Sequence, residues 1–286
     1  MSLSPLTRRF RHTPRDEIAG EEYDNAAAAA DYVAAHEGWG PFARFFHSRL
    51  HVVGEALHVC PGGRLLDVGC GPGMLVGHLL DTRPDDFRIT ACDRSTAMID
   101  ATTERVKDAD GVELTVARVE DMPFSDECFD VVLAMGVLEY ADAGQAIREI
   151  ARVLRPGGLV VATMDNPLGP YRLFEWFVYW PALRLLGWIE RSLGKNPRHG
   201  APSSGMRAIP AARLRRLLRE TGLAPQETVY FDVTPLVPPL DRLVRRWSRR
   251  WRDHPERTVS RGAFRWLGTA YLVTARRRLP RYVHPA

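Results

Sequence analysis

Short apolar runs alternate with amphipathic segments through the middle of the chain. The apolar runs predict strands at residues 65–68, 88–93, 112–116, 129–134 and 159–164. Apolar side chains at helical spacing predict helices at residues 74–80, 95–107 and 143–154. A repeat of strand, helix and strand can bury both faces of its sheet only when the sheet is doubly wound, so the predicted fold class is α/β.

The segment ahead of this repeat is different in character. Residues 1–20 are polar and basic, and we expect a flexible N-terminus there. Residues 21–59 contain two predicted helices, one capped by Asp24 and ending at Gly38, the other starting at Pro41. Together they predict a helical lid or dimer element ahead of the core.

Three further parts follow the helical lid. Residues 60–164 form the predicted core, and residues 165–209 form an aromatic-rich insertion. Residues 210–286 complete the sheet with a helix that stops at Gly222 and with two strands, at 229–233 and 271–275, joined by a long connection.

A glycine-rich turn follows the first predicted strand. Gly69, Gly71 and Gly73 allow a sharp turn and let a ligand approach bare amides at the start of a helix. The second strand ends in Asp93, where a carboxylate reaches the hydroxyls of a ribose held over the turn. Asp67, ahead of the glycines, would repel a pyrophosphate but suits an ammonium group. The predicted ligand is therefore a nucleoside derivative.

Three motifs together resemble class I S-adenosylmethionine-dependent methyltransferases, in particular the small-molecule type of ubiquinone and menaquinone biosynthesis. They are D-V-G-C-G-P-G at 67–73, F-D-V-V-L-A-M-G-V-L-E-Y at 129–140 and L-R-P-G-G-L-V-V-A-T at 154–163. The resemblance implies a Rossmann-like seven-stranded sheet closed by an antiparallel hairpin, with N-terminal helices over the active site. It also implies S-adenosyl-L-methionine as the cofactor.

The family's cofactor contacts carry over to matching positions of this chain. The three glycines would approach the methionine and ribose portions, Asp67 would hold the ammonium group, and Asp93 would take the ribose hydroxyls. Met98 would pack on the adenine, and Ala134 would begin a run of carbonyls that faces the cofactor's amino group.

One departure concerns adenine recognition. Relatives carry an acid after the third strand, where this chain has Arg118. Glu120 or Asp121 would then replace it as the acceptor for the adenine amine, and the N–H of Val119 would serve a ring nitrogen. A shifted contact would weaken cofactor affinity by only about 1 kcal/mol.

Methyl transfer is an in-line displacement, so a base is needed only if the acceptor must lose a proton. Tyr140 is a candidate positioning residue near the methyl group. Glu139, Asp165 and Glu175 are candidate acids facing the pocket. A purely structural role remains open for each acid, because surface carboxylates usually have no catalytic role.

Seven aromatic side chains lie between Tyr171 and Trp188. In one interpretation Leu173, Phe177, Trp180 and Leu183 form the core face of a helix pair. We favour an acceptor pocket for a lipophilic molecule, or contact with a membrane surface, because one amphipathic face holds fewer aromatics. An anionic head group such as a phosphate could meet the arginines nearby, which are Arg44, Arg49, Arg172, Arg184 and Arg191.

Charge and histidine spacing raise two alternatives. Residues 241–286 hold thirteen arginines against three acids, which suggests nucleic acid. The motifs of nucleic-acid methyltransferases are missing, however, so we expect no nucleic-acid partner and favour a solvated or dimer-forming face; a homo-oligomer stays open. His47 and His51 are spaced i, i+4, but no third ligand stands nearby, so we expect packed or solvated histidines and no metal.

Cysteine usage and hydropathy bear on the compartment. The four cysteines lie far apart without a C-x-x-C pair, which favours reduced thiols. No run of about eighteen uncharged apolar residues predicts a membrane span. The N-terminus lacks an apolar signal-peptide core, so we expect a cytoplasmic protein.

The resulting hypothesis is methyl transfer from S-adenosylmethionine to a small lipophilic acceptor, such as a quinone-like, prenyl or polyketide-type intermediate of secondary metabolism. Two alternatives remain. The fold could bind the cofactor without methyl transfer, as a cyclase or regulatory module, or the protein could be a peripheral-membrane lipid N-methyltransferase.

Overall fold

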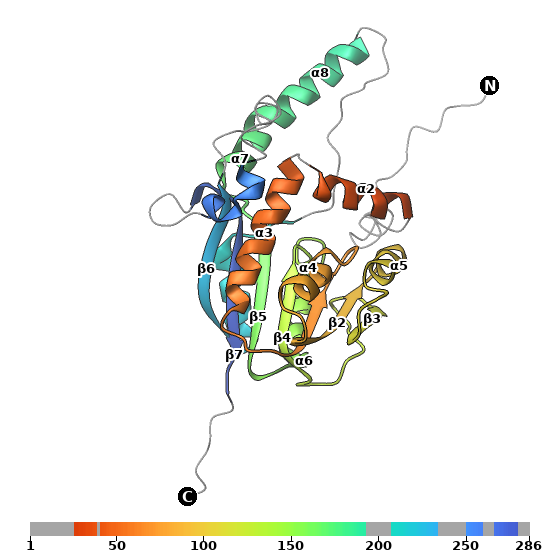
Figure 1. Cartoon of the computed structure of the whole chain (residues 1–286). Coiled ribbons are helices and arrows are strands. Elements are labelled where there is room, and N and C mark those ends of the chain that lie inside the picture. Colours follow the sequence, from red (N-terminus) through yellow and green to blue (C-terminus); the bar gives the residue numbers. More distant parts are fainter. Residues whose placement is uncertain (1–25, 39–40, 193–206, 234–249, 260–265, 280–286) are drawn as a thin grey trace, which may run out of the picture.

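Seven strands form one twisted sheet in the order β3-β2-β1-β4-β5-β7-β6 (Figure 1). The computed structural model describes residues 26–38, 41–192, 207–233, 250–259 and 266–279. The strands β1 to β5 pair in parallel, whereas β7 runs antiparallel to both β5 and β6. The predicted doubly wound sheet with its closing hairpin is thus confirmed. The strands are β1 (Gly63–Val68), β2 (Phe87–Asp93), β3 (Val112–Val116), β4 (Phe129–Met135), β5 (Leu154–Asp165), β6 (Leu223–Val233) and β7 (Gly268–Arg277).

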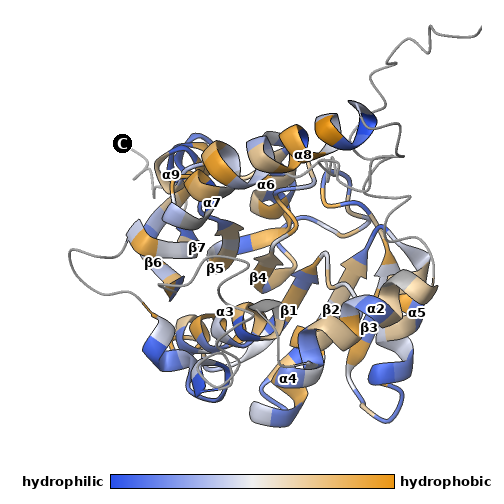
Figure 2. Cartoon of the chain, turned by 90° about the horizontal axis from the view of Figure 1, so that it is seen from above, coloured by the Kyte–Doolittle hydropathy of each residue, from blue (hydrophilic) through white to orange (hydrophobic). Residues whose placement is uncertain are grey.

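Helices cover both faces of the sheet, as the view from above shows (Figure 2). α3, α4 and α5 pack on one face, and α6 and α9 on the other. α2 lies across the carboxyl ends of the strands, above α5 (Figure 1). The helical elements are α2 (Ala26–Glu37), α3 (Pro41–Leu57), α4 (Met74–Thr82), α5 (Thr96–Arg105), α6 (Ala143–Val153), α7 (Pro170–Phe174), the π-helical turn η1 (Glu175–Tyr179), α8 (Trp180–Ser192), α9 (Ala211–Glu220) and the 3-10 turn η2 (Pro255–Thr258).

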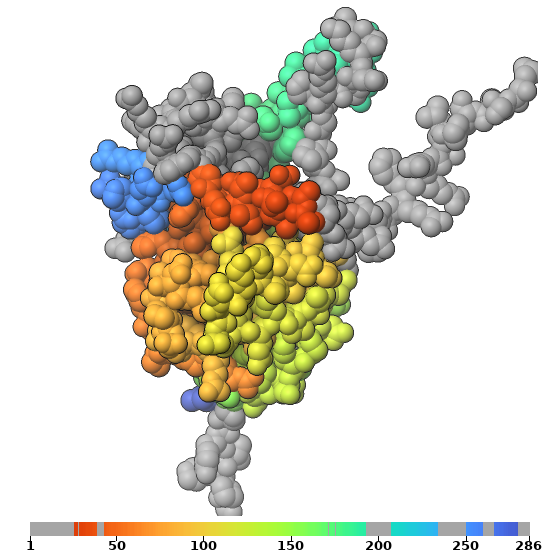
Figure 3. All heavy atoms as spheres, turned by 45° about the vertical axis from the view of Figure 1, so that its right-hand side comes forward, coloured from red at the N-terminus to blue at the C-terminus, as the bar shows by residue number. Residues whose placement is uncertain are grey.

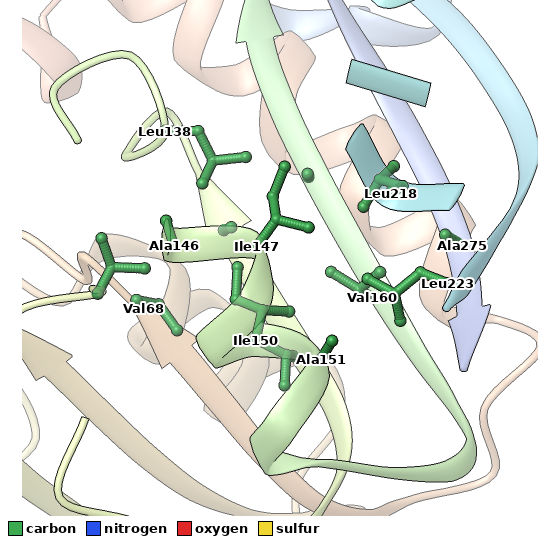
Figure 4. Close-up of a cluster of buried hydrophobic side chains, with 14 of the residues drawn as sticks. Val68, Leu138, Ala146, Ile147, Ile150, Ala151, Val160, Leu218, Leu223 and Ala275 are labelled. Atoms are coloured by element: carbon green, nitrogen blue, oxygen red, sulfur yellow. The ribbon is translucent and has the colours of Figure 1, made fainter. Parts of the chain in front are cut away.

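Each face of the sheet has its own apolar core. On the α6 side, Ile147 and Ile150 pack against Val68 and Val160 from the strands and near Leu218 of α9 (Figure 4). Burying one such side chain contributes about 1.5–3 kcal/mol. The spacing of these residues on α6 is the helical period that predicted the element, and Asp142 caps the helix by accepting from the Gln145 N–H at 2.9 Å.

α3, the second of the two N-terminal helices, packs against α2 and against β6 at one edge of the sheet. Its predicted apolar residues Phe46, Leu50, Val53 and Leu57 are buried. The Ser48 hydroxyl lies 2.7 Å from the hydroxyl of Thr258 in η2, which brings part of the long connection before β7 onto α3.

The strand predicted at residues 112–116 is present as β3, at the edge of the sheet, where Val116 is exposed. One local expectation was wrong. The Arg-Pro-Gly-Gly sequence was expected to separate α6 from a strand at residue 159. Instead β5 begins at Leu154, which pairs with Phe129, and residues 155–158 leave the ladder before pairing resumes at Leu159 with Val131.

Candidate active site

The glycine loop between β1 and α4 is held from several sides. The Gly69 N–H donates to the Cys92 carbonyl at 2.7 Å, and the Gly71 N–H donates to Asp93 Oδ2 at 2.9 Å. The hydroxyl of Thr102 on α5 donates to the Gly71 carbonyl at 2.8 Å. The loop is therefore fixed in place before a ligand arrives, which lowers the ordering cost of binding.

Two of the loop glycines have different reasons to be glycine. Gly69 has φ 69°, and an added Cβ would come within 2.6 Å of Val137 Cγ2. Gly71 has φ 54°, and an added Cβ would meet no described atom within 4 Å. Gly69 thus permits a close approach of two loops, whereas Gly71 borders open space where a ligand can approach the backbone.

Asp67 is a buried carboxyl without a protein partner. Its side chain is 1% exposed, and neither carboxyl oxygen has a hydrogen-bond partner among the described residues. Burial, and secondarily the nearby Asp93, raises the pKa of Asp67 to about 7. A buried carboxylate without a counter-charge is costly, so the site fits a cationic ligand group such as the ammonium of S-adenosylmethionine.

Asp93 organises the loop as well as facing it. Its second oxygen, Oδ1, accepts from the Ser95 N–H at 2.9 Å, at the start of α5. Burial raises the pKa of Asp93, and the hydrogen bonds from Ser95 and Gly71 oppose that rise. Each carboxylate oxygen keeps a further lone pair that can accept from a ribose hydroxyl, so the predicted ribose contact is compatible with these bonds.

On the predicted adenine side of the site, Glu120 already makes structural contacts within the protein. Met98 and Val119 are buried. Glu120 accepts the Asp142 N–H at 3.1 Å and lies 3.7 Å from Arg118, so its carboxylate supports the start of α6. The roles of Met98, Val119 and Glu120 toward adenine stay predictions.

A groove of about 770 Å³ lies between α2 and α5, next to the start of α5. Small side chains such as Ala30 and Ala34 line it from α2, and Ala97 and Ala101 line it from α5. The small side chains on the facing sides of α2 and α5 therefore leave open space between the two helices, near the predicted adenine end of the site. The assignment of the N-terminal helices as a lid stays a prediction.

A buried cation lies where β4 leaves the sheet. Ala134 is the last residue of β4 paired with β1. Beyond it, Gly136 adopts φ 75°, and Arg49 Nη1 of α3 would lie 2.8 Å from a Cβ added there. Arg49 is 7% exposed, its Nε has no hydrogen-bond partner among the described residues, and its guanidinium lies 4.4 Å from the ring centre of Phe45.

Two acids lie beside this arginine at the ends of β4 and β5. Glu139 is 4% exposed and accepts the N–H of Asp165. Burial first, and Asp165 second, raises the pKa of Glu139 to about 8, while Arg49 opposes the rise. Asp165 itself pairs with Arg172 at 2.5 Å. The structure thus brings together two predicted acids and two of the predicted arginines.

The other two candidates are placed less fully. Tyr140 is half-buried, and its N–H donates to the Val137 carbonyl at 3.0 Å. Glu175 begins η1, but its side chain lies outside the described part of the structure. Their roles near the methyl group stay predictions.

The remaining arginines expected near a head group lie elsewhere. Arg44 forms a buried ion pair with Asp232 at 2.7 Å, and Asp232 also accepts from the Thr269 hydroxyl. Arg184 and Arg191 are exposed on α8. Of these five arginines, Arg49 is the one that the structure places at the end of β4 with a buried, unpaired Nε.

Within residues 165–192, which the structure describes, the aromatic insertion does not form a packed helix pair. Leu173 and Phe177, expected in a core face, are exposed, Phe177 at 75%. They are exposed because α7, η1 and α8 form a segment that projects away from the sheet (Figure 1). Trp180 and Leu183, the other residues of that face, are half-buried. The acceptor-pocket assignment of residues 165–209 stays a prediction, and residues 193–206 lie outside the described structure.

Histidines and basic residues have structural contacts. His47 Nε2 accepts from Arg252 at 3.2 Å, and burial lowers the pKa of His47. Arg277 pairs with Glu127 at 2.7 Å, although many arginines of residues 241–286 lie outside the described ranges. Among the described residues, no three or more His, Cys, Asp or Glu side chains cluster in a way that could hold a metal ion. None of the described helices has the length and apolarity needed to cross a membrane.

Sequence reasoning missed the loop contact of Thr102, and although it named Arg49 as a head-group candidate, it missed the approach of Arg49 to Gly136 and Glu139. Each polar residue sits within an otherwise inward-facing helical stripe, since Thr102 follows Met98 by four positions and Arg49 follows Phe46 by three. A polar residue on a buried helical face is the signal that could have identified both.

Comparison with known proteins gives a consistent picture. A family model for a methyltransferase domain matches residues 66–162. The ubiquinone/menaquinone biosynthesis C-methyltransferase UbiE of Geotalea daltonii is 30% identical over 162 residues, which cover 53% of this chain and 65% of that protein. The demethylmenaquinone methyltransferase of Symbiobacterium thermophilum is 30% identical over 191 residues, which cover 64% of this chain and 70% of that protein. The matches thus span about two thirds of each relative's length.

Solved structures agree on the fold. The geranyl diphosphate C-methyltransferase of Streptomyces coelicolor A3(2) superposes with a TM-score of 0.54 at 15% identity, covering 96% of this chain and all of that one. The cyclase SpnF superposes with a TM-score of 0.54 at 20% identity, covering 81% of each chain. At these identities the likeness concerns the fold alone.

Proposed function

This chain belongs to the class I S-adenosylmethionine-dependent methyltransferases of the ubiquinone and menaquinone type, and on that premise we propose that it methylates a small lipophilic acceptor. S-adenosyl-L-methionine is the cofactor, and when bound it supplies a methyl group on a positively charged sulfur. The acceptor class we propose is a quinone-like, prenyl or polyketide-type intermediate.

One observation carries the acceptor chemistry: a buried acid of raised pKa beside a buried arginine at the end of β4. Glu139 in its deprotonated form would take the proton that the acceptor loses, and Arg49 would stabilise the negative charge that remains on the acceptor. A hydroquinone or an enol fits this pair, because loss of its hydroxyl proton makes a ring or chain carbon nucleophilic.

The atoms balance without a further reactant. The acceptor's hydroxyl proton would go to the Glu139 carboxylate, and an electron pair of the acceptor would form the new bond to the methyl carbon that the cofactor supplies, with the electron pair of the methyl–sulfur bond left on sulfur. The hydrogen of the methylated carbon would then leave as a proton while the oxygen regains one, so that one proton is released overall. The protein aligns the reactants and excludes water.

An anionic head group is the second way to satisfy Arg49. A prenyl diphosphate would place oxygen acceptors against the guanidinium, which suits planar donors of this kind. The two acceptor classes differ in when they would use Glu139: a hydroquinone loses its hydroxyl proton to make the carbon nucleophilic, whereas methylation of a prenyl double bond leaves a carbocation that must lose a C–H proton afterwards.

The first test follows methyl transfer to a prenylated hydroquinone and to a prenyl diphosphate by mass spectrometry. With the hydroquinone, we expect kcat/KM to rise about tenfold per pH unit up to a pKa of about 8 and then level off, since the base must be deprotonated. Glu139→Gln should lower kcat by about 100-fold or more and flatten this profile.

The control is Glu104→Gln, which removes an exposed acid of α5 that pairs with Lys107 beyond the end of that helix, and it should leave the pH profile unchanged. Cofactor affinity, measured by calorimetry, should stay within about threefold in both variants. Tight cofactor binding with no product from any acceptor would refute methyl transfer and favour a cyclase or a regulatory module.

A further inference from the structure

Residues 170–192 form an arm, made of α7, η1 and α8, that projects from the body on the side of the carboxyl ends of the strands (Figures 1 and 3). Of the thirteen residues of α8, all of them described, only Gly187 is buried. Nine of the fourteen exposed large apolar side chains in the described structure lie on the arm. They include Phe177, Leu185, Leu186 and Trp188, with Trp188 at 61% exposure.

In water, an arm of this kind lacks a surface that buries its apolar side chains. A helix of thirteen residues is marginal in isolation, and most helical stability in proteins comes from burying an apolar face. Exposed apolar side chains concentrated in one place mark an interaction surface. The π-helical turn η1 that joins α7 to α8 is a rare element that occurs often at functional sites.

The arrangement of residues on α8 indicates what kind of surface covers it. At about 100° per residue, Leu185, Leu186, Trp188 and Ile189 span an arc of about 160°. Arg184 and Arg191 lie together beyond one edge of this arc, on a side that also holds the half-buried Trp180 and Leu183. A broad apolar arc with tryptophan, bordered by arginines, is typical of helices that lie in the plane of a membrane interface.

Charge adds an independent argument. Residues 180–207 contain five cationic residues, Arg184, Arg191, Lys195, Arg198 and Arg207, against the single acid Glu190. The difference of +4 equals the formal net charge of the whole chain. A cationic stretch of sequence that contains and follows an apolar helix suits the negative surface of a bilayer that contains anionic lipids.

We propose that this arm docks on an anionic membrane surface, with the apolar arc of α8 among the lipid head groups and its arginines against the lipid phosphates. The carboxyl ends of the strands, where Asp67 and Glu139 lie, then face the same surface as the arm. A lipophilic acceptor could pass from the bilayer toward the site without crossing water. Docking itself does not depend on methyl transfer.

The test is co-sedimentation of the full chain with vesicles. Wild-type protein should bind vesicles containing roughly 30% phosphatidylglycerol at least about tenfold more tightly than vesicles of phosphatidylcholine alone, and high salt should reduce this binding. Trp188→Ser combined with Ile189→Ser should weaken binding to the anionic vesicles by about tenfold or more, since it removes two apolar anchors.

A matched control removes exposed apolar side chains from the opposite end of the sheet. Val59→Ser combined with Leu279→Ser should keep binding within about twofold of wild type, because neither residue is on the arm. Circular dichroism and thermal unfolding should show that both double variants fold, since all four side chains are exposed.

Two results would overturn the proposal. One is absence of wild-type binding to the anionic vesicles, or equal binding by the arm variant. The other is light scattering that finds a dimer in the absence of lipid, which the arm substitutions convert to a monomer; the arc would then be an interface between two copies of the chain.

Discussion

The two sides of the crevice at the carboxyl ends of the strands differ in how completely the protein satisfies its own polar groups. On the β1 and β2 side, hydrogen bonds of 2.7 to 2.9 Å join Gly69 to Cys92, Gly71 to Asp93 and to Thr102 of α5, and Asp93 to Ser95. On the β4 and β5 side, Arg49 keeps an unpaired Nε, and the arm that follows β5 is largely exposed. One side is built around a fixed ligand, whereas the other depends on partners outside the chain.

Asp67 is the exception on the otherwise satisfied side, and it shows what the difference means. The β1 and β2 side, called the donor side from here on, accepts one ligand, so a single unpaired carboxyl can be left for that ligand's cation. The β4 and β5 side, called the acceptor side, must bind a molecule, release its product and, on the proposal above, contact a membrane. Unpaired charge and exposed apolar surface on that side are therefore distributed over several elements.

The largest expected effect comes from Asp67→Asn. At pH 8 the affinity for S-adenosylmethionine should fall by about 100-fold, because a neutral amide cannot form an ion pair with the ammonium group. Without cofactor, the same variant should gain stability relative to wild type as the pH rises. Folding raises the pKa of Asp67 from 3.8 to about 7, and a carboxyl whose pKa is higher in the folded state loses stability between those two values.

Calorimetry at pH 8 measures the affinity, and denaturant unfolding at pH 4.5 and at pH 8 measures the stability difference, which should reach a few kcal/mol at most. Asp108→Asn, at an exposed acid after α5, is the control and should change neither quantity. Unchanged cofactor affinity in Asp67→Asn would mean that the carboxyl does not face the ammonium group.

The same contrast explains how much of the molecule could be predicted from the sequence. The donor side follows from local rules: glycines with positive φ, a helix start and an acid at a strand end all leave marks at fixed spacing. The order of strands β1 to β5 and the closing hairpin followed from the same regular pattern.

The acceptor side could not be predicted in this way, because its contacts join residues far apart in the chain. Arg49 lies against Gly136, which is 87 positions further along the chain. Nothing in the local sequence of either residue indicates that the other is its neighbour. The aromatic run suggested burial, since aromatic side chains are usually packed, but the pattern cannot distinguish a protein core from a surface that another body covers. Phe177 at 75% exposure is the clearest case.

The next effect in size concerns Arg49. Arg49→Met should lower kcat/KM for the acceptor by about 30-fold, and Arg49→Lys should recover part of the loss by restoring the charge without the planar donors. Cofactor affinity should change less than about twofold. The stability of the methionine variant should equal or exceed that of wild type, because the substitution removes a buried guanidinium with an unpaired nitrogen.

Arg44→Met supplies the matched comparison. It breaks a buried pair and leaves Asp232 without its cation, so it should destabilise the fold by about 3 kcal/mol or more. If Arg49→Met destabilises the protein as much as Arg44→Met does, Arg49 is a structural counter-ion of Glu139 and Asp165, and its proposed role toward the acceptor is wrong.

The smallest expected effect separates the fold of the glycine loop from its function. Gly71 and Gly111 both have positive φ, 54° and 80°, and an added Cβ would meet no described atom within 4 Å at either position. Gly71→Ala and Gly111→Ala should therefore each cost about 1 kcal/mol of stability, because both place a side chain in the left-handed region. Only Gly71→Ala should also weaken S-adenosylmethionine binding, by about tenfold, because its Cβ occupies space that the cofactor needs. Chemical denaturation measures the stability of both variants, and calorimetry measures their cofactor affinity. Equal cofactor affinity in both variants would show that the ligand does not approach the backbone at Gly71, and the donor side would then lose the feature that distinguishes it from an ordinary tight turn.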